Sequence, residues 1–115
     1  MLKYLGIAFL GGYMGVAHSA VNVDASRIES IEVRSSGAHA VYLVGSMPSS
    51  SCTYNDRAII LDNGSVGGKA LLDTALAAFI ANKTVIIRVD GCAFLNPEAS
   101  SVTSPRIIKI QVFNL

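Results

Sequence analysis

The chain has 115 residues, enough for one domain, of which 51% are hydrophobic and 15% are charged. This composition excludes a disordered chain, and a formal net charge of +1 gives no electrostatic reason to expect a nucleic acid or an anionic membrane as partner. We therefore expect no nucleic acid binding and no membrane insertion.

Residues 1–20, MLKYLGIAFLGGYMGVAHSA, have the pattern of a secretory signal peptide. Lys3 supplies a positive start, the apolar stretch 4–16 is short for a membrane span, and Ala17 and Ser19 are the small residues that precede a cleavage site. The alternative is a membrane-anchored amino terminus. The pattern predicts export to the periplasm or outside the cell, and one mature domain over 21–115 with eight basic and eight acidic residues.

The mature chain is predicted to contain five strands and one helix. Alternating or β-branched residues predict strands, and Gly, Ser, Pro, Asp and Asn predict the connections between them. In chain order we expect strands at 27–35, 39–44 and 57–61, a helix that ends at Asn82–Lys83, strands at 84–89 and 106–113, and long loops at 45–56 and 90–105.

Apolar spacing predicts which side chains point inward. On the helix the expected buried stripe is Leu71, Leu72, Ala75, Leu76, Phe79 and Ile80, and the opposite face carries Lys69, Asp73, Thr74, Ala77, Ala78 and Ala81. On the strands we expect Ile108, Ile110 and Val112 to point inward, and Ile60, Ile86, Ile107 and Phe113 outward. The small helix face and the outward apolar residues predict a homo-oligomer, the alternative being the scattered apolar exposure of any small protein.

The order β-β-β-α-β-β predicts a mostly β protein. Five short strands that close into a Greek-key barrel have no open edges, and a helix between the third and fourth strands plugs one end. This is the order of the OB fold. A ferredoxin-like sandwich needs a helix after its first strand, and the chain between Arg34 and His39 is too short for one.

Cys52 and Cys92 are the only cysteines. An oxidising compartment favours one disulfide between them, which closes a loop of about 40 residues and stabilises the fold by about 4 kcal/mol in the chain-entropy model. The alternative is a pair of thiols that bind a metal. His39 is the only histidine of 21–115, and no carboxylates cluster near it in sequence, so we expect no metal and no other cofactor.

No motif in the chain predicts catalysis, so we expect a binding protein rather than an enzyme. OB barrels bind oligosaccharides or oligonucleotides on the face of their second and third strands and in the adjoining loops. A sugar site needs an aromatic ring with hydroxyl or amide partners. The loops offer Tyr54 beside 49–51, and Phe94 beside Asn96, although these residues equally suit solvated loops.

The helix and the strand after it carry a resemblance to a known family. Lys69-x-Leu71-Leu72-Asp73-x-Ala75, then Phe79, then Val85-x-Ile87-x-Val89 resembles the B subunits of bacterial AB5 toxins of the subtilase cytotoxin type. The same stretch, ending in Asp90-Gly91-Cys92, is similar to short exported bacterial proteins of unknown function.

The resemblance implies a pentamer of OB-fold subunits whose helices line a central pore and whose barrels bind host glycans, with a catalytic A subunit as a possible partner. It also implies a sugar site near the start of the first strand, where Asp24 and Ser26 lie. The expected carbohydrate-binding residues are thus Asp24, Ser26, Tyr54 and Phe94. The alternative function is a periplasmic or secreted module that binds or inhibits another protein.

Overall fold

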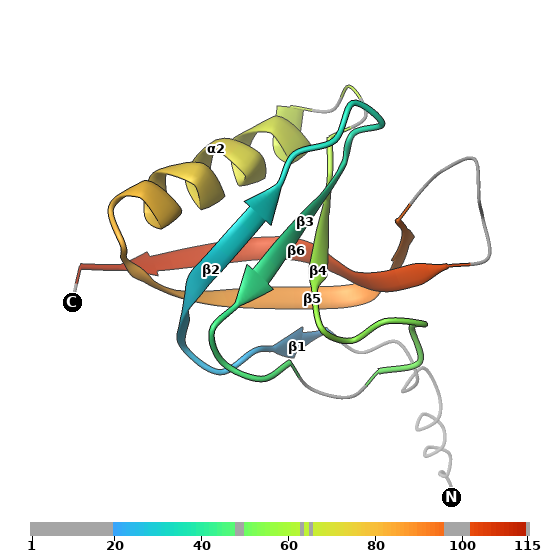
Figure 1. Ribbon diagram of the computed structural model, residues 1–115, viewed down its shortest axis with the longest axis horizontal. Helices are drawn as coiled ribbons and strands as arrows, with labels where there is room; N and C mark the ends of the chain where they lie inside the picture. The colour runs from blue at the N-terminus through green and yellow to red at the C-terminus, as the bar shows by residue number, and fades with distance from the viewer. Residues whose placement is uncertain (1–19, 48–49, 63, 65, 96–101, 115) are drawn as a thin grey trace, which may run out of the picture.

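The protein is mostly β, with one helix in the part of the chain that is described. This computed structural model describes residues 20–47, 50–62, 64, 66–95 and 102–114. The elements in chain order are β1 (Val21–Asn22), β2 (Ser26–Glu32), β3 (Ala38–Leu43), β4 (Ala58–Leu61), α2 (Val66–Ile80), β5 (Thr84–Phe94) and β6 (Thr103–Phe113) (Figure 1). The predicted order is confirmed from β2 to β6, and β1 is an additional short strand. The predicted signal peptide lies outside the described residues, apart from its last residue.

Hydrogen bonding between neighbouring strands forms a ring. β2, β3 and β4 are an antiparallel meander, and β4 then pairs in parallel with β6 through Ile59 and Arg106. β6 pairs antiparallel with β5 along most of its length. The ring returns to β2 where Ser26 and Arg27 pair with the start of β5. β1 pairs with a later part of the same strand β5.

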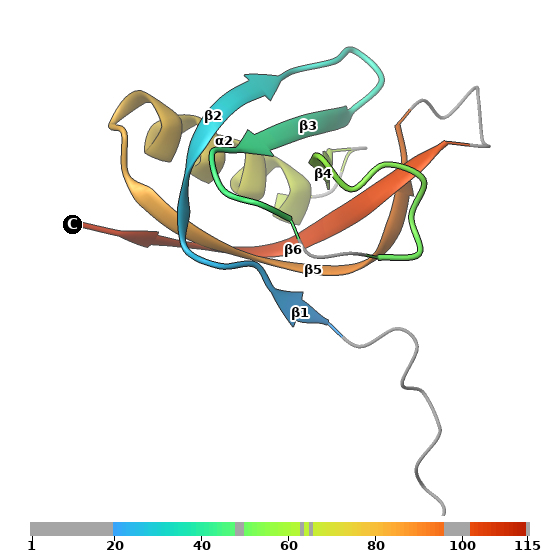
Figure 2. The same cartoon turned by 60° about the horizontal axis from the view of Figure 1, so that its bottom comes forward.

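The side chains that point into the ring form the main core, and α2 packs against it beside β2 and β6 (Figure 2). Ile60, Ile87 and Val41 are fully buried, and each such side chain contributes roughly 1.5–3 kcal/mol of hydrophobic free energy. The other buried members are Val23, Ile28, Leu43, Ala58, Leu72, Ala75, Ala78, Val85, Val89 and Ile107.

A second apolar cluster lies on the outer face of β3 and β4. Ala38, Ala40 and Ile59 on that face are completely buried, because Ala93 of β5 and Leu95, directly after β5, pack over them. The far end of the β5–β6 hairpin therefore covers part of the face formed by β3 and β4. This explains why β4 is buried on both sides: Ile60 faces the main core and Ile59 faces the hairpin. The prediction that Ile60 points outward to solvent is wrong.

β5 and β6 are longer than predicted. The bounds predicted for the loop at 90–105 are therefore wrong at both ends. β5 continues to Phe94 and β6 starts at Thr103. Gly91 has a φ of 69°, within a register shift between Val89 and Cys92, and Pro105 pairs with Cys92 beyond it. Glycine and proline predicted a loop here, but a β-bulge accommodates both within a continuing pair of strands.

A second irregularity in the same pair reverses the predicted orientation of two isoleucines. Arg88 pairs with Lys109 but the next residue, Val89, pairs with Ile107, so Ile108 is an extra residue on β6. Ile107 is 3% exposed and Ile108 is 40% exposed, the opposite of the prediction. An extra residue in one strand shifts the inward and outward alternation by one, and the sequence pattern does not show where this happens.

α2 meets the sheet through a face made mostly of small side chains. Its buried residues are Gly68, Leu72, Ala75 and Ala78, spaced three or four apart. A Cβ added at Gly68 would lie 2.0 Å from the carbonyl oxygen of Leu61, so the helix start packs directly on the end of β4. Ala78 lies on this same face of the helix and is 2% exposed. The larger Phe79 and Ile80, predicted to be buried, are 40% and 81% exposed.

The helix ends at the predicted position. Asn82 has a φ of 55°, in the left-handed region that asparagine tolerates. The N–H of Asn82 donates to the carbonyl of Phe79 and the N–H of Lys83 donates to that of Ala78, which is the Schellman arrangement. On the exposed face of the helix, Lys69 and Asp73 form an ion pair at 3.3 Å.

The predicted disulfide between Cys52 and Cys92 is present, with a Cα–Cα distance of 5.7 Å. It joins the connection before β4 to β5. No helix among the described residues is long and apolar enough to span a membrane.

Candidate functional site

Arg57 is the centre of a cluster at the start of β4. Its Nε and Nη2 donate hydrogen bonds of 2.8 and 3.0 Å to the two carboxylate oxygens of Asp56. Its guanidinium carbon lies 5.2 Å from the ring centroid of Tyr42 and 5.0 Å from that of Tyr54. Both distances are within the range of a cation–π contact. We call Tyr42, Tyr54, Asp56 and Arg57 the arginine–tyrosine cluster.

Strand register brings Arg57 to Tyr42. Val41 of β3 pairs with Ala58 of β4, so the residue after Val41 and the residue before Ala58 lie opposite each other in this antiparallel pair. Tyr42 is half-buried at the margin of the outer apolar cluster. The hairpin that covers Ala38 and Ala40 leaves the Tyr42 end of β3 partly open.

Tyr54 is held in place by β6. Its N–H donates to the carbonyl of Thr103 at 2.9 Å. The N–H of Thr53 donates to Thr103 Oγ1, and the N–H of Thr103 donates to Thr53 Oγ1, each at 3.1 Å. With the neighbouring Cys52 disulfide, these contacts fix a segment that has no helix or strand of its own. Tyr54 is 46% exposed, so a ligand can reach it.

The electrostatics of the cluster are those of a tight ion pair. The hydrogen-bonded guanidinium of Arg57 lowers the pKa of Asp56, and Asp56 in turn raises the pKa of Arg57. The charge of Glu32 also raises the pKa of Arg57, though less than Asp56 does. Asp56 therefore stays ionised, and its side chain is 64% exposed.

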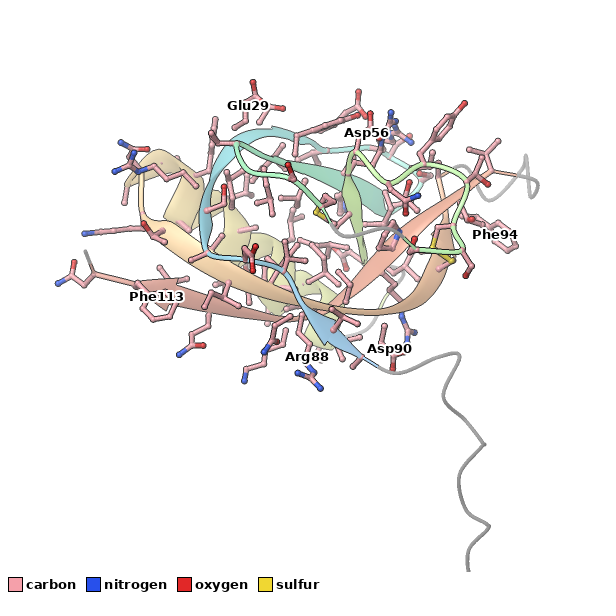
Figure 3. The ribbon with its side chains drawn as sticks, turned by 90° about the horizontal axis from the view of Figure 1, so that it is seen from below. Glu29, Asp56, Arg88, Asp90, Phe94 and Phe113 are labelled. Atoms are coloured by element: carbon pink, nitrogen blue, oxygen red, sulfur yellow. A yellow bond between two sulfur atoms is a disulfide. The ribbon has the colours of Figure 1, made fainter. Side chains whose placement is uncertain are left out.

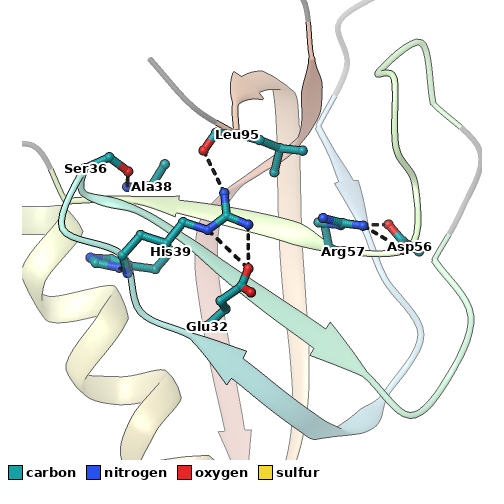
Figure 4. A network of polar contacts seen from close by, with 8 residues as sticks. Glu32, Ser36, Ala38, His39, Asp56, Arg57 and Leu95 are labelled. Atoms are coloured by element: carbon teal, nitrogen blue, oxygen red, sulfur yellow. Dashed lines mark hydrogen bonds and ion pairs between the residues drawn. The ribbon is translucent and has the colours of Figure 1, made fainter. Parts of the chain in front are cut away.

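A second arginine–carboxylate pair lies nearby, at the end of β2. Arg34 donates from Nε and Nη2 to Glu32 Oε1, and from Nη1 to the carbonyl of Leu95 at 2.8 Å (Figure 4). The Leu95 contact ties the end of the β5–β6 hairpin to β2. This pair therefore secures the hairpin over the face of β3 and β4.

Asp24 and Ser26, two of the predicted sugar-binding residues, lie at the start of β2. Asp24 is exposed, whereas the Ser26 hydroxyl accepts a hydrogen bond of 2.8 Å from the N–H of Gly45 and donates to the carbonyl of Arg27 at 3.1 Å. The hydroxyl thus joins β2 to the chain that leaves β3. No contact between described residues links Asp24 or Ser26 to the arginine–tyrosine cluster.

The backbones of Phe94 and Tyr54 both contact Thr103, but the Phe94 side chain points to a different face of the molecule. It pairs with Thr103, the same residue that binds the backbone of Tyr54. Because Ala93 and Leu95 pack on β3 and β4, strand alternation turns Phe94 to the opposite face of the hairpin, where it is 46% exposed. The two aromatic residues predicted for a sugar site are therefore not brought onto one surface.

Of the arginine–tyrosine cluster, only Tyr54 was predicted from the sequence; Tyr42, Asp56 and Arg57 were not. The adjacent opposite charges Asp56 and Arg57, two and three residues after Tyr54, are the one local signal. Tyr42 is 15 residues from Arg57 and is paired with it only by the register of β3 and β4. The cluster contains two flat aromatic surfaces and a planar, charged hydrogen-bonding pair, which suits recognition of a polar ligand. Comparisons of the chain with protein-family models, with curated proteins and with solved structures find no match.

Proposed function

We propose that this chain is a glycan-binding protein with an OB fold and that the arginine–tyrosine cluster is its recognition surface. The fold proposal is supported by the pairing order of the strands, which includes the parallel pair β4–β6, and by the position of α2 between β4 and β5. β3 and β4 then correspond to the second and third strands of the barrel, on whose face OB domains bind ligands.

The observation that carries the functional proposal is the placement of Arg57 between two tyrosine rings while it holds the exposed carboxylate of Asp56. A sugar presents an apolar C–H face and a rim of hydroxyl groups. Tyrosine rings accommodate the first, and a charged planar pair exchanges strong hydrogen bonds with the second. Since the β5–β6 hairpin covers the centre of the β3–β4 face, the cluster at its margin is the part that remains accessible.

Binding of the oxidised protein to an array of immobilised glycans tests the proposal. Tyr54→Ala is expected to lower retention at least about tenfold, which corresponds to about 1.4 kcal/mol. Phe94→Ala is the matched control, because Phe94 has the same exposed fraction and faces away from the cluster. Asp24→Ala tests the site that the toxin resemblance implies.

Each result has a distinct meaning. Loss of retention in Tyr54→Ala with retention in Phe94→Ala and Asp24→Ala supports the arginine–tyrosine cluster. Loss in Asp24→Ala alone would move the site to the start of β2, and loss in Phe94→Ala alone would move it to the other face of the hairpin. A wild-type protein that retains no glycan would refute the function.

We further propose export and assembly as a B-like subunit of five copies, with host glycans as ligands and an A subunit as a further partner. The disulfide suits an oxidising compartment. Exposed Phe79 and Ile80 on α2 and exposed Val112 on β6 favour contact between copies.

The native mass of the oxidised protein tests the assembly. We expect the mass of five chains, and a reduced assembly for Ile80→Glu. A monomeric wild-type protein at micromolar concentration would contradict assembly, and the exposed apolar residues would then favour a different protein as partner.

A further inference from the structure

We infer that the ligand of the arginine–tyrosine cluster is an uncharged saccharide that presents neighbouring hydroxyl groups, and not an acidic sugar. This inference rests on the glycan-binding function proposed above and names its ligand class. It follows from how the charges around the cluster are already paired.

The guanidinium groups of Arg57 and of Arg34 are both engaged by carboxylates. Arg57 donates two hydrogen bonds to Asp56, and Arg34 donates two to Glu32 and one to the carbonyl of Leu95 (Figure 4). Neither arginine carries a positive charge that lacks a carboxylate partner. An acidic sugar would have to displace Asp56 from Arg57, or approach the exposed, ionised carboxylate of Asp56 with Glu32 nearby. Like charges brought together in this way cost binding free energy.

An uncharged sugar meets no such conflict. Each carboxylate oxygen of Asp56 accepts one hydrogen bond from Arg57 and has a further lone pair for a sugar hydroxyl. Arg57 has five N–H donors, of which two are used by Asp56, so the ion pair presents acceptors and donors side by side. Neighbouring hydroxyl groups, which both donate and accept, match such a planar pair, and Tyr54 supplies a surface for the C–H face.

Basic side chains without ion-pair partners are found elsewhere in the described chain. Arg88 and Lys109 lie directly opposite each other on β5 and β6, and Arg106 lies three residues before Lys109 on β6. Seen from below, Arg88 is on the side of the molecule opposite to Asp56 (Figure 3). An anionic ligand is therefore expected to favour the β5–β6 face over the arginine–tyrosine cluster.

The test compares pairs of sugars that differ in one group. The methyl glycosides of glucose, galactose and mannose are titrated into ¹⁵N-labelled oxidised protein, beside the corresponding methyl uronides, in which a carboxylate replaces the C6 hydroxymethyl group. We expect at least one neutral glycoside to shift the backbone amides of Tyr42, Tyr54 and Arg57, and its uronide to bind there at least about tenfold more weakly.

A variant separates charge from shape. Asp56→Asn keeps the size of the side chain but leaves Arg57 with an unopposed charge, so uronide binding at the cluster should strengthen about tenfold relative to the wild-type protein. Asp73→Asn makes the same change in net charge on the exposed face of α2, and should leave the ratio between neutral and acidic sugars unchanged.

The outcomes distinguish this inference from the function on which it rests. A uronide that shifts Tyr54 and Arg57 at lower concentration than its neutral partner would overturn the inference and leave glycan binding in place. If no sugar shifts these residues, the proposed function fails and the inference fails with it. Uronide shifts confined to Arg88 and Lys109, with neutral-sugar shifts at Tyr54 and Arg57, support the inference.

Discussion

The backbone N–H of Arg34 donates a hydrogen bond of 3.0 Å to Nδ1 of His39. His39 is 4% exposed, and its Nε2 lies 3.9 Å from Asp62 Oδ2. Because Nδ1 is the acceptor, the neutral imidazole carries its proton on Nε2, toward Asp62. His39 therefore holds the backbone of Arg34, and the side chain of Arg34 secures the β5–β6 hairpin. The buried histidine thus has a structural role.

Replacing His39 with alanine should destabilise the fold. The N–H of Arg34 would lose its acceptor in a partly buried position, at a cost of about 1–3 kcal/mol. Urea unfolding measures the loss. His39→Asn places an amide oxygen near the position of Nδ1 and should recover part of it. A loss below about 0.5 kcal/mol in His39→Ala would show that the hydrogen bond contributes little.

The two glycines at the start of α2 should respond in opposite ways to alanine. A Cβ at Gly68 would lie 2.0 Å from the carbonyl oxygen of Leu61, so Gly68→Ala should cost about 1–3 kcal/mol despite the better helix propensity of alanine. Nothing lies within 4 Å of a Cβ at Gly67, so Gly67→Ala should stabilise by about 0.5–1 kcal/mol. Thermal unfolding of both variants checks the pair. Equal effects would contradict the close packing of α2 on β4.

Removing the disulfide should weaken both the fold and the site. The bridge closes a sequence separation of 40 residues, so replacing Cys52 and Cys92 with serine is expected to cost about 4 kcal/mol. It also frees the segment that carries Tyr54, so glycan retention should fall under conditions where the variant is still folded. Unchanged retention by a folded double variant would show that the contacts of Thr103 suffice to position Tyr54.

The Asp56–Arg57 pair predicts how the stability of the fold changes with pH. The folded pKa of Asp56 is lowered by the hydrogen bonds from Arg57, so the pair stabilises the fold above the unfolded pKa of the carboxyl and loses this contribution as the pH falls through the folded pKa. The effect is small because Asp56 is exposed. NMR titration of the Asp56 carboxyl carbon should give a higher midpoint in Arg57→Gln than in the wild-type protein. An unchanged midpoint would mean that the pair does not persist in solution.

Local sequence signals predicted the features that depend on few residues. The two cysteines in a chain predicted to be exported predicted the disulfide, and Asn82 after the apolar helix predicted where α2 ends. Strand ends and orientations were less predictable, because Gly91 and Pro105 indicate a loop and only the register with the partner strand shows a bulge. Burial of Ala78 in place of Phe79 likewise depends on how closely α2 approaches the sheet.

The candidate site was predicted only in part, because it too depends on strand register. Tyr54 was identified as an aromatic residue in a loop, which needs no knowledge of the fold. Tyr42 and Arg57 meet only through the pairing of β3 with β4, and a sequence does not state that register. Phe94 had the right chemistry, but strand alternation in the unpredicted end of β5 turns it to the other face of the hairpin.

Tyrosine fluorescence is the most direct measurement of sugar binding at the arginine–tyrosine cluster. The chain has four tyrosines and no tryptophan, and Tyr4 and Tyr13 lie in the predicted signal peptide. In the cleaved, oxidised protein the emission therefore comes from Tyr42 and Tyr54 alone. We predict a saturable change in this emission during titration with neutral methyl hexosides, with no such change in Tyr54→Ala. Constant emission from wild-type protein at sugar concentrations that saturate its binding by another method would contradict the assignment of the cluster as the binding site.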